Sequence, residues 1–336
     1  MTENILKNIS RNISRNMLIV AIVAGVIGMS AATRVEGRGA GAGDRGGRLA
    51  PADTVVVFDA GTLAGPLKAA FDSFATQAPA VLQQENAGSL ETARKLLDLG
   101  RTPDVLALAD DEIFPRLLMP AHATWYARFA RNRMVIAYTD KSRGASEITT
   151  SNWYSVLQRS GVETGRSDPN LDPAGYRALL VMQLAEREYG RAGLAASLEK
   201  AASTRNIRPK SADLVALVQA GELDYAYMYQ SSAEAGKLKY VRLPEHIDLG
   251  EPADSAFYAQ ASVRVTGATP GSTVEFRGGL ITYGLSIPVG APHQAAATRF
   301  VAFLFSPAGK RAMRAQHLDV LDTPVMLGQG VPPDLH

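Results

Sequence analysis

The chain contains no cysteine among its 336 residues. This absence excludes disulfide bonds, thiolate metal sites, cysteine nucleophiles and a lipid-modified cysteine behind an N-terminal leader. Histidine is scarce as well, and its five copies are scattered without the spacing of a metal-binding motif. The sequence also lacks a Walker loop and a nucleophile elbow. These absences together give little support to catalytic chemistry.

An excess of charge of one sign is also missing. The formal net charge is +2, and residues 1–50 hold seven of the 35 basic residues but only three of the 33 acidic ones. Residues 51–336 therefore carry 28 basic and 30 acidic residues, a formal charge of −2. Because a nucleic-acid-binding domain usually has a basic excess, no nucleic-acid partner is expected.

The N-terminal residues have the pattern of a secretory leader. Three basic residues precede an uncharged run over 17–32, which ends in small residues. The run is shorter than the roughly 20 residues that span a membrane comfortably. We expect residues 1–33 to be a signal peptide or a retained membrane anchor, and the rest of the protein to lie outside the cytoplasm. Residues 34–50, rich in Gly and Arg, are expected to be a linker.

Two strand–turn–helix units open the folded part. A β-branched run over 54–58 predicts a buried strand, which is followed by a glycine turn that contains Thr62. Residues 81–86 predict a second strand, which is followed by a glycine turn that contains Ser89. In an open parallel sheet such turns converge at the carboxyl ends of the strands, where ligands bind. Thr62 and Ser89 are therefore candidate ligand contacts. The alternative is that each simply caps its own helix.

A polar loop, GRSDPNLDPAGYR at 165–177, leads into an apolar-periodic helix. Asp172 suits the N-cap of that helix, and Pro173 suits its first position. A helix N-terminus presents unpaired N–H groups and a partial positive charge, so this loop could hold an anion. The alternative is a well-capped surface helix. Ser211 has the same place before a helix predicted over 212–220.

Period-two spacing places three tyrosines on one face of a strand predicted over 223–229. An aromatic packing face explains at least two of them. Tyr229, beside a polar Gln-Ser-Ser run, is best placed to donate its phenol to a ligand.

Two apolar strands, over 134–139 and 280–288, predict crossings between two parts of the molecule. A chain that leaves one βα domain, builds a second and returns has the architecture of a hinged, two-lobed binding protein. We expect an α/β fold with lobe I formed by residues 51–133 plus 285–336, and lobe II by residues 134–284.

Several motifs along the chain carry a family resemblance. They are AGTLAGP (60–66), AGS (87–89), DVLALAD (104–110), FARNRMVIAYT (129–139), NWY (152–154), GRSDPNLDPAGYR (165–177), IRPKSADL (207–214) and ITYGLSIP (281–288). Together they resemble the molybdate/tungstate-binding proteins of ABC importers, closest to the tungstate-binding branch described in archaea. The resemblance covers nearly everything from Thr54 to about Gly309.

The resemblance implies a type II periplasmic-binding-protein fold, with a hinge of two crossover strands and no catalysis or cofactor. The oxyanion would lie in the interlobe cleft against hydroxyls and backbone N–H groups. Thr62 and Ser89 would contact it from the first lobe, and Asp172, Ser211 and Tyr229 from the second. The implied partners are an ABC permease and its ATPase. The protein would be an extracytoplasmic monomer, associated with the membrane only through an uncleaved N-terminus.

One departure concerns the metal centre of the oxyanion. The tungstate branch resembles Tyr/Phe-Glu-Tyr where this chain has Met228 between two tyrosines. In that branch this glutamate, and a carboxylate from the loop that corresponds to 165–177 here, are thought to approach Mo or W directly. Here the oxyanion either stays four-coordinate, with Asp172 acting as a helix cap, or Asp172 alone contacts the metal and raises the number to five. A drifted ligand preference is the third possibility.

Two alternative functions remain at this point. A binding protein for sulfate or phosphate would use the same hinge and the same hydroxyl and N–H donors. An α/β enzyme would have to use Asp168 or Asp172, in phosphoryl or acyl chemistry for instance.

Overall fold

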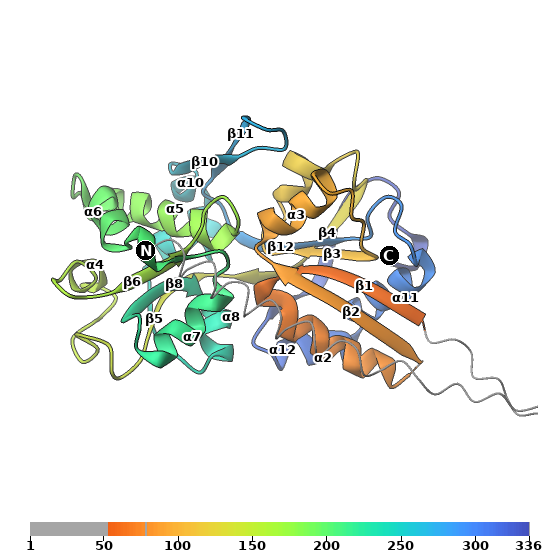
Figure 1. The fold of residues 1–336 in the computed structure, drawn as a ribbon, viewed down its shortest axis with the longest axis horizontal. Coiled ribbons are helices and arrows are strands. Elements are labelled where there is room, and N and C mark those ends of the chain that lie inside the picture. The colour runs from red at the N-terminus through yellow and green to blue at the C-terminus, as the bar shows by residue number, and fades with distance from the viewer. Residues whose placement is uncertain (1–52, 78, 336) are drawn as a thin grey trace, which may run out of the picture. The chain divides into compact units, whose positions relative to one another are not determined.

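The computed structural model describes residues 53–77 and 79–335 (Figure 1). The expected leader (1–33) and linker (34–50) lie outside the described residues. The described part has two main β-sheets with helices packed against them, which confirms the predicted α/β class. Among its helices, none is long and apolar enough to cross a membrane.

The first sheet has six strands in the order β13-β4-β12-β3-β1-β2. The strands are β1 (Asp53–Ala60), β2 (Ala80–Ala87), β3 (Val105–Leu108), β4 (Trp125–Asn132), β12 (Ile281–Ser286) and β13 (Asp319–Gly328). β1 pairs in parallel with both β2 and β3, and the last residues of β1 and β2, Ala60 and Ala87, lie opposite each other. The turns that follow these two strands therefore leave from the same edge of the sheet.

Helices α2 (Ala64–Ala75), α3 (Ser89–Leu97), α11 (Gln294–Phe305) and α12 (Pro307–Arg314) accompany this sheet, with short helices η1 (Gly61–Leu63), η2 (Phe114–Leu118) and η5 (Pro333–Leu335). Apolar residues at helical spacing give α2 one buried face. From that face Phe71 and Phe74 meet Phe300 of α11, with ring centroids 5.2 and 5.6 Å apart. We call this sheet with its helices the first lobe.

The second sheet has the order β7-β6-β8-β5-β9. Its strands are β5 (Met134–Tyr138), β6 (Thr164–Ser167), β7 (Ile207–Arg208), β8 (Tyr225–Tyr229) and β9 (Lys239–Arg242). Its helices are α4 (Trp153–Val156), α5 (Pro173–Glu188), α6 (Leu194–Ala201), α7 (Ala212–Ala220), α8 (Gln230–Ala235), α9 (Glu245–Asp248) and α10 (Ser255–Tyr258), with η3 (Thr204–Asn206) and η4 (Pro252–Asp254). A separate ribbon pairs β10 (Ser262–Thr266) with β11 (Thr273–Arg277). We call these elements the second lobe.

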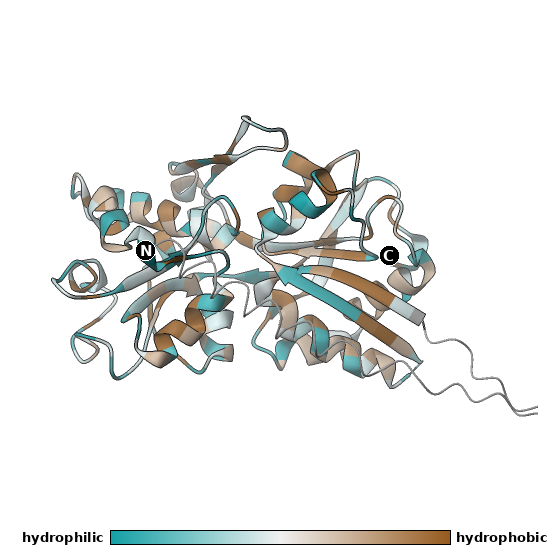
Figure 2. Cartoon of the chain, viewed as in Figure 1, coloured by the Kyte–Doolittle hydropathy of each residue, from teal (hydrophilic) through white to brown (hydrophobic). Residues whose placement is uncertain are grey.

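The buried residues are mainly apolar, and Figure 2 shows the brown, apolar segments along the strands and helices of both sheets. Figure 1 shows α5 and α7 on opposite faces of the second sheet, and β8 packs against both. The three tyrosines of β8 belong to the larger apolar cluster, whereas Ala226 and Met228 belong to a smaller cluster with Leu214 of α7. The predicted alternation along this strand is therefore confirmed, and both of its faces are buried.

The chain passes between the sheets in two places. Only Arg133 separates the end of β4 from the start of β5. On the way back, β11 ends at Arg277 and β12 pairs with β4 from Ile281 onward. We expected the lobe boundary between residues 284 and 285. That point falls inside β12, because the apolar run over 280–288 contains a strand that already pairs with the first sheet at Ile281.

Candidate functional site

Loops of the two lobes meet at the N-terminus of α3. The backbone N–H groups of Leu90 and Glu91 donate to the carbonyl oxygen of Leu171, at 3.0 and 3.2 Å. The first turn of this helix in the first lobe is therefore capped by the second lobe. Gly88 allows the approach, because a Cβ there would lie 2.7 Å from the carbonyl carbon of Leu171 and 3.1 Å from the Cβ of Asp172. The turns after β2 and before α5 are thus in direct contact.

Asp172 holds two helix starts of the second lobe together. Its Oδ1 accepts from the N–H of Ala174 at 3.2 Å, which confirms the predicted N-cap of α5. Its Oδ2 accepts from the N–H of Ser211 at 2.5 Å, at the start of α7. Asp172 is 4% exposed; burial raises the pKa of its carboxyl, and the two N–H donors oppose that rise. Ser211 occupies the cap position of α7, but its side chain makes no capping hydrogen bond.

Neither Thr62 nor Ser89 caps a helix. Ser89 Oγ accepts from the N–H of Ala109 at 2.9 Å, so its own hydroxyl proton remains available. Thr62 Oγ1 is enclosed and makes no hydrogen bond. It lies near the hydroxyl of Tyr283 but without good hydrogen-bond geometry. Burial raises the pKa of that phenol, and Thr62 and Asn132 oppose the rise. The simple capping alternative therefore does not describe these two hydroxyls.

Tyr229 is held by a buried arginine. Arg177 Nη1 donates to the Tyr229 hydroxyl oxygen at 2.5 Å and to the carbonyl oxygen of Ala109 at 2.6 Å. Arg177 Nη2 lies 3.1 Å from Asp110 Oδ2, and the Tyr176 hydroxyl donates to the same carboxylate. Burial is the largest single influence on Arg177 and opposes its charged form, but Asp110, Tyr229 and Tyr176 together outweigh that cost and hold the pKa of the guanidinium above its ordinary value. This cluster joins the lobes, because Ala109 and Asp110 follow β3 whereas Arg177 lies on α5.

A second polar connection lies at the crossover from β4 to β5. Asn132 Nδ2 donates to the Tyr283 hydroxyl at 2.9 Å and to Ser231 Oγ of the second lobe at 2.7 Å. The rings of Tyr283 and Tyr229 meet edge to face, with centroids 6.0 Å apart. Thr62 is thus joined to Tyr229 through Tyr283.

The five residues predicted from the sequence form a set of two groups where the lobes meet: Asp172 with Ser211, and Thr62, Ser89 and Tyr229 around Tyr283 and Arg177. Asp172 binds Ser211 directly, and Ser89 and Tyr229 are linked through Ala109 and Arg177. Asp168 is outside this set: its Oδ1 accepts from the N–H of Asn170 within its own loop. Sequence reasoning missed the contacts of Asp110, Arg177, Asn132 and Tyr283. The available signal was that all four residues lie within the motifs carrying the resemblance.

A sequence profile described as "Bacterial extracellular solute-binding protein" matches residues 55–319. The chain belongs to this family. The solute-binding protein is also 43% identical over 260 residues to an uncharacterized solute-binding protein of Petrotoga mobilis, covering 77% of this chain and 81% of the relative. It is 36% identical over 301 residues to the molybdate/tungstate-binding protein WtpA of Pyrococcus abyssi, covering 82% and 86%. These relatives confirm the resemblance drawn from the motifs.

Solved structures confirm the fold. The sulfate-binding protein SubI of Mycobacterium tuberculosis matches with a TM-score of 0.56 at 13% identity, covering 80% of the solute-binding protein and 88% of SubI. The periplasmic molybdate-binding protein of Azotobacter vinelandii matches with a TM-score of 0.54 at 14% identity, covering 79% and 98%. At these identities the similarity establishes the two-lobed α/β fold of periplasmic binding proteins.

Met228 of the solute-binding protein has no exposed surface. It points to the face of β8 opposite Tyr229 and packs in the smaller cluster with Val135 and Leu214. A carboxylate at this position would be enclosed with no water around it, so it would need a partner to remain ionised.

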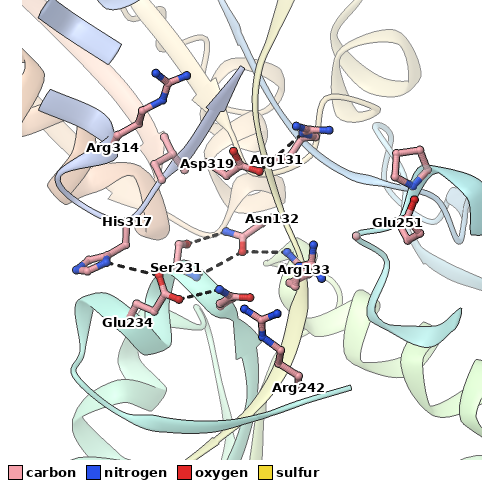
Figure 3. A pocket seen from close by; sticks show the side chains of 14 residues that line it. Arg131, Asn132, Arg133, Ser231, Glu234, Arg242, Glu251, Arg314, His317 and Asp319 are labelled. Carbon is pink, nitrogen blue, oxygen red and sulfur yellow. Dashed lines mark hydrogen bonds and ion pairs between the residues drawn. The ribbon is translucent and has the colours of Figure 1, made fainter. Parts of the chain in front are cut away.

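Two cavities of the solute-binding protein lie beside this set of residues. One, of about 530 Å³, is lined by Asn132 and Ser231 and by several charged side chains (Figure 3). Four arginines line it, Arg131, Arg133, Arg242 and Arg314, together with three carboxylates. Arg131 lies 3.8 Å from Asp319, Arg133 3.2 Å from Asp248, and Arg314 2.7 Å from Asp322. The other, of about 320 Å³, is lined by Asp110, Tyr176 and Arg177 among others.

Within residues 53–77 and 79–335, no group of three or more Asp, Glu or His side chains is arranged to hold a metal ion. The site offers neutral donors, the buried carboxylates of Asp172 and Asp110, and Arg177, which is paired with Asp110.

Proposed function

We propose that this protein captures molybdate or tungstate between its lobes and delivers it to an ABC importer. The observation that carries the proposal is Thr62 Oγ1, which is buried and has no hydrogen-bond partner. Buried polar atoms are nearly always satisfied, so this hydroxyl, beside Tyr283 where the lobes meet, is free to donate to a ligand that enters there. Ser89 and Tyr229 lie in the same set and each has a hydroxyl proton to give. Three neutral O–H donors suit an oxyanion.

The relatives support the choice of ligand. WtpA of Pyrococcus abyssi and WtpA of Thermococcus kodakarensis, both named molybdate/tungstate-binding proteins, are 36% and 35% identical to this chain over most of its length. Sulfate is less well supported, since the similarity to the sulfate-binding protein is confined to the fold. We therefore place sulfate and phosphate second, and we propose no catalytic role for Asp168 or Asp172.

For Asp172 we propose a role mainly as a helix cap. A carboxylate repels a dianion by about 4 kcal/mol per unit-charge pair at 4 Å near a protein surface. Each of its oxygens already accepts a backbone N–H, from Ala174 and Ser211. These donors favour a carboxylate that holds α5 and α7 in place while the ligand stays four-coordinate. Direct contact of Asp172 with the Mo or W centre, giving five oxygens, is the competing arrangement.

The transport role assigns the remaining parts. We propose that residues 53–133 and 281–335 form one lobe and residues 134–280 the other, and that they close about the two crossings. The N-terminal 33 residues would export the protein or anchor it, with residues 34–50 as linker, so that a monomer meets an ABC permease and its ATPase at the outer face of the membrane. No cofactor is needed, because the oxyanion is the cargo.

Titration calorimetry of the purified protein with tungstate, molybdate, sulfate and phosphate in turn tests the proposal. We expect one-to-one binding of tungstate or molybdate, with sulfate and phosphate silent. The Mo–O and W–O bonds are longer than S–O and P–O, so a cavity shaped for the former leaves the smaller anions with unmade hydrogen bonds. Heat from sulfate or phosphate alone would show that the fold is shared and the specificity is not.

A further inference from the structure

We infer that Arg177 is a positioning residue that makes the Tyr229 hydroxyl a donor to the oxyanion only when the two lobes are together. This inference rests on the proposed function and adds a residue to its site. Arg177 does not need to touch the ligand in this role. It acts by donating a hydrogen bond to the phenol oxygen of Tyr229. It is held in that position by its contacts with Ala109 and Asp110 of the first lobe.

The hydrogen bonding of Tyr229 gives the first step. A phenol has one proton to donate and an oxygen that can accept. Tyr229 has no exposed surface, and its oxygen accepts from Arg177 Nη1 at 2.5 Å. Within the described residues its proton reaches no protein acceptor. Because the guanidinium of Arg177 donates to the phenol oxygen, the hydroxyl proton of Tyr229 must point away from Arg177. An oxygen of the bound anion would accept that proton.

The contacts of Arg177 give the second step. Its fork reaches three oxygens: the Tyr229 hydroxyl in its own lobe, and the Ala109 carbonyl and the Asp110 carboxylate in the other. Arg177 is 3% exposed and Asp110 is 5% exposed. Separating the lobes would remove two of the three contacts and free the guanidinium to turn away from the phenol. Lysine cannot replace this arrangement, because a single ammonium lacks the rigid planar fork.

The charges explain why the arginine is paired. An unpaired buried guanidinium would attract the dianion strongly and oppose its release. Asp110 offsets that charge, so the oxyanion meets a neutral donor in Tyr229. Burying the Arg177–Asp110 pair costs desolvation that its attraction only about repays. The Arg177–Asp110 pair therefore orients the Tyr229 hydroxyl without stabilising the closed arrangement of the lobes when no ligand is bound.

A double-mutant cycle tests this coupling. The purified wild-type protein, Tyr229→Phe, Arg177→Met and the double variant are titrated with tungstate and with molybdate. Loss of a hydrogen bond to a charged ligand predicts that each single variant binds about 10- to 100-fold more weakly. The double variant should be no weaker than the weaker single variant, because both changes remove the same donor. Arg177→Lys should bind as weakly as Arg177→Met.

Arg143→Met is the matched control, since it removes an ion pair with Asp224 that lies wholly within the second lobe. It should bind like wild type, and thermal unfolding without ligand checks that each variant is folded. If Arg177→Met does not fold, the cycle is run with Arg177→Lys.

Two results would overturn the inference while leaving the proposed function intact: additive losses in the cycle, or wild-type binding by Arg177→Lys. If the wild-type protein binds neither tungstate nor molybdate, the proposed function and this inference fall together.

Discussion

Gly88 offers the most direct test of whether this arrangement of the lobes is the one that binds ligand. Its backbone angles, φ −64° and ψ 147°, suit any residue, so Gly88→Ala should leave the first lobe intact. The new methyl group would lie 2.7 Å from the carbonyl carbon of Leu171 in the second lobe, and nearer still to its oxygen. Carbon atoms pack at about 3.5–4.0 Å, so the two loops must separate by about 1 Å.

The expected loss follows from two hydrogen bonds. The N–H groups of Leu90 and Glu91 lie 3.0 and 3.2 Å from the Leu171 oxygen, and moving it by that amount takes both beyond hydrogen-bond range. At about 0.5–1.5 kcal/mol net for each bond, the closed form loses about 1–3 kcal/mol. Because a ligand held by both lobes needs that form, affinity should fall about 5- to 150-fold.

Calorimetric titration with the preferred oxyanion measures the loss, and small-angle scattering reports whether ligand still compacts the protein. Gly65→Ala is the matched control: it lies in α2, and the added methyl would have only Gln316 Oε1 near it, at 3.7 Å. We expect unchanged affinity there. Wild-type affinity and full compaction in Gly88→Ala would refute the reasoning, because the contact between Gly88 and Leu171 would then be irrelevant to binding.

Three further substitutions test single carboxyl groups. Asp172→Asn keeps one acceptor and loses the other, to Ala174 or Ser211, so the ligand-free Tm should fall. If Asp172 only caps these helices, tungstate should raise the Tm of the variant as much as that of wild type, and a smaller rise would place Asp172 on the metal centre. Burial raises the pKa of Asp59 to about 7, with Gln84 opposing, so the ligand-free protein should lose stability as pH rises from about 4 through 7. The Asp59→Asn variant has no such carboxyl, so it should avoid this loss of unfolding free energy, which is at most about 4 kcal/mol. The Tm of the variant minus that of wild type should therefore increase between pH 4 and pH 8, and a constant difference in Tm would contradict the raised pKa of Asp59. Met228→Glu buries a carboxylate on the face of β8 opposite Tyr229, so the ligand-free Tm should fall and tungstate should raise it no more than it raises that of wild type; a larger rise would mean that residue 228 reaches the ligand.

Local chemistry made part of the site predictable. Asp172 followed by Pro173 at the start of an apolar-periodic run is a capping pattern that depends only on neighbours in sequence, and the structure has that cap. The alternation of tyrosines along β8 is equally local. Both features survive folding because tertiary contacts add to them without competing.

The remaining parts depend on contacts distant in the sequence. Arg177 and Asp110 are 67 positions apart and meet only because the lobes are together. Ser89 has the residue type of a cap, yet Gly88 takes the cap position, since the second lobe's carbonyl supplies the acceptor that a side chain would otherwise give. No local pattern reports an acceptor that arrives from the other lobe.

The single-residue link at Arg133 has a kinetic consequence. With β4 ending at Asn132 and β5 beginning at Met134, the sheets can pivot but have little slack to slide apart. On the proposed function, an oxyanion enclosed by groups from both sheets leaves only after that pivot, so its residence time is set by how often the lobes open. A membrane transporter would then not need to bind the oxyanion more tightly than this protein does. Opening the lobes would be enough to release the ligand.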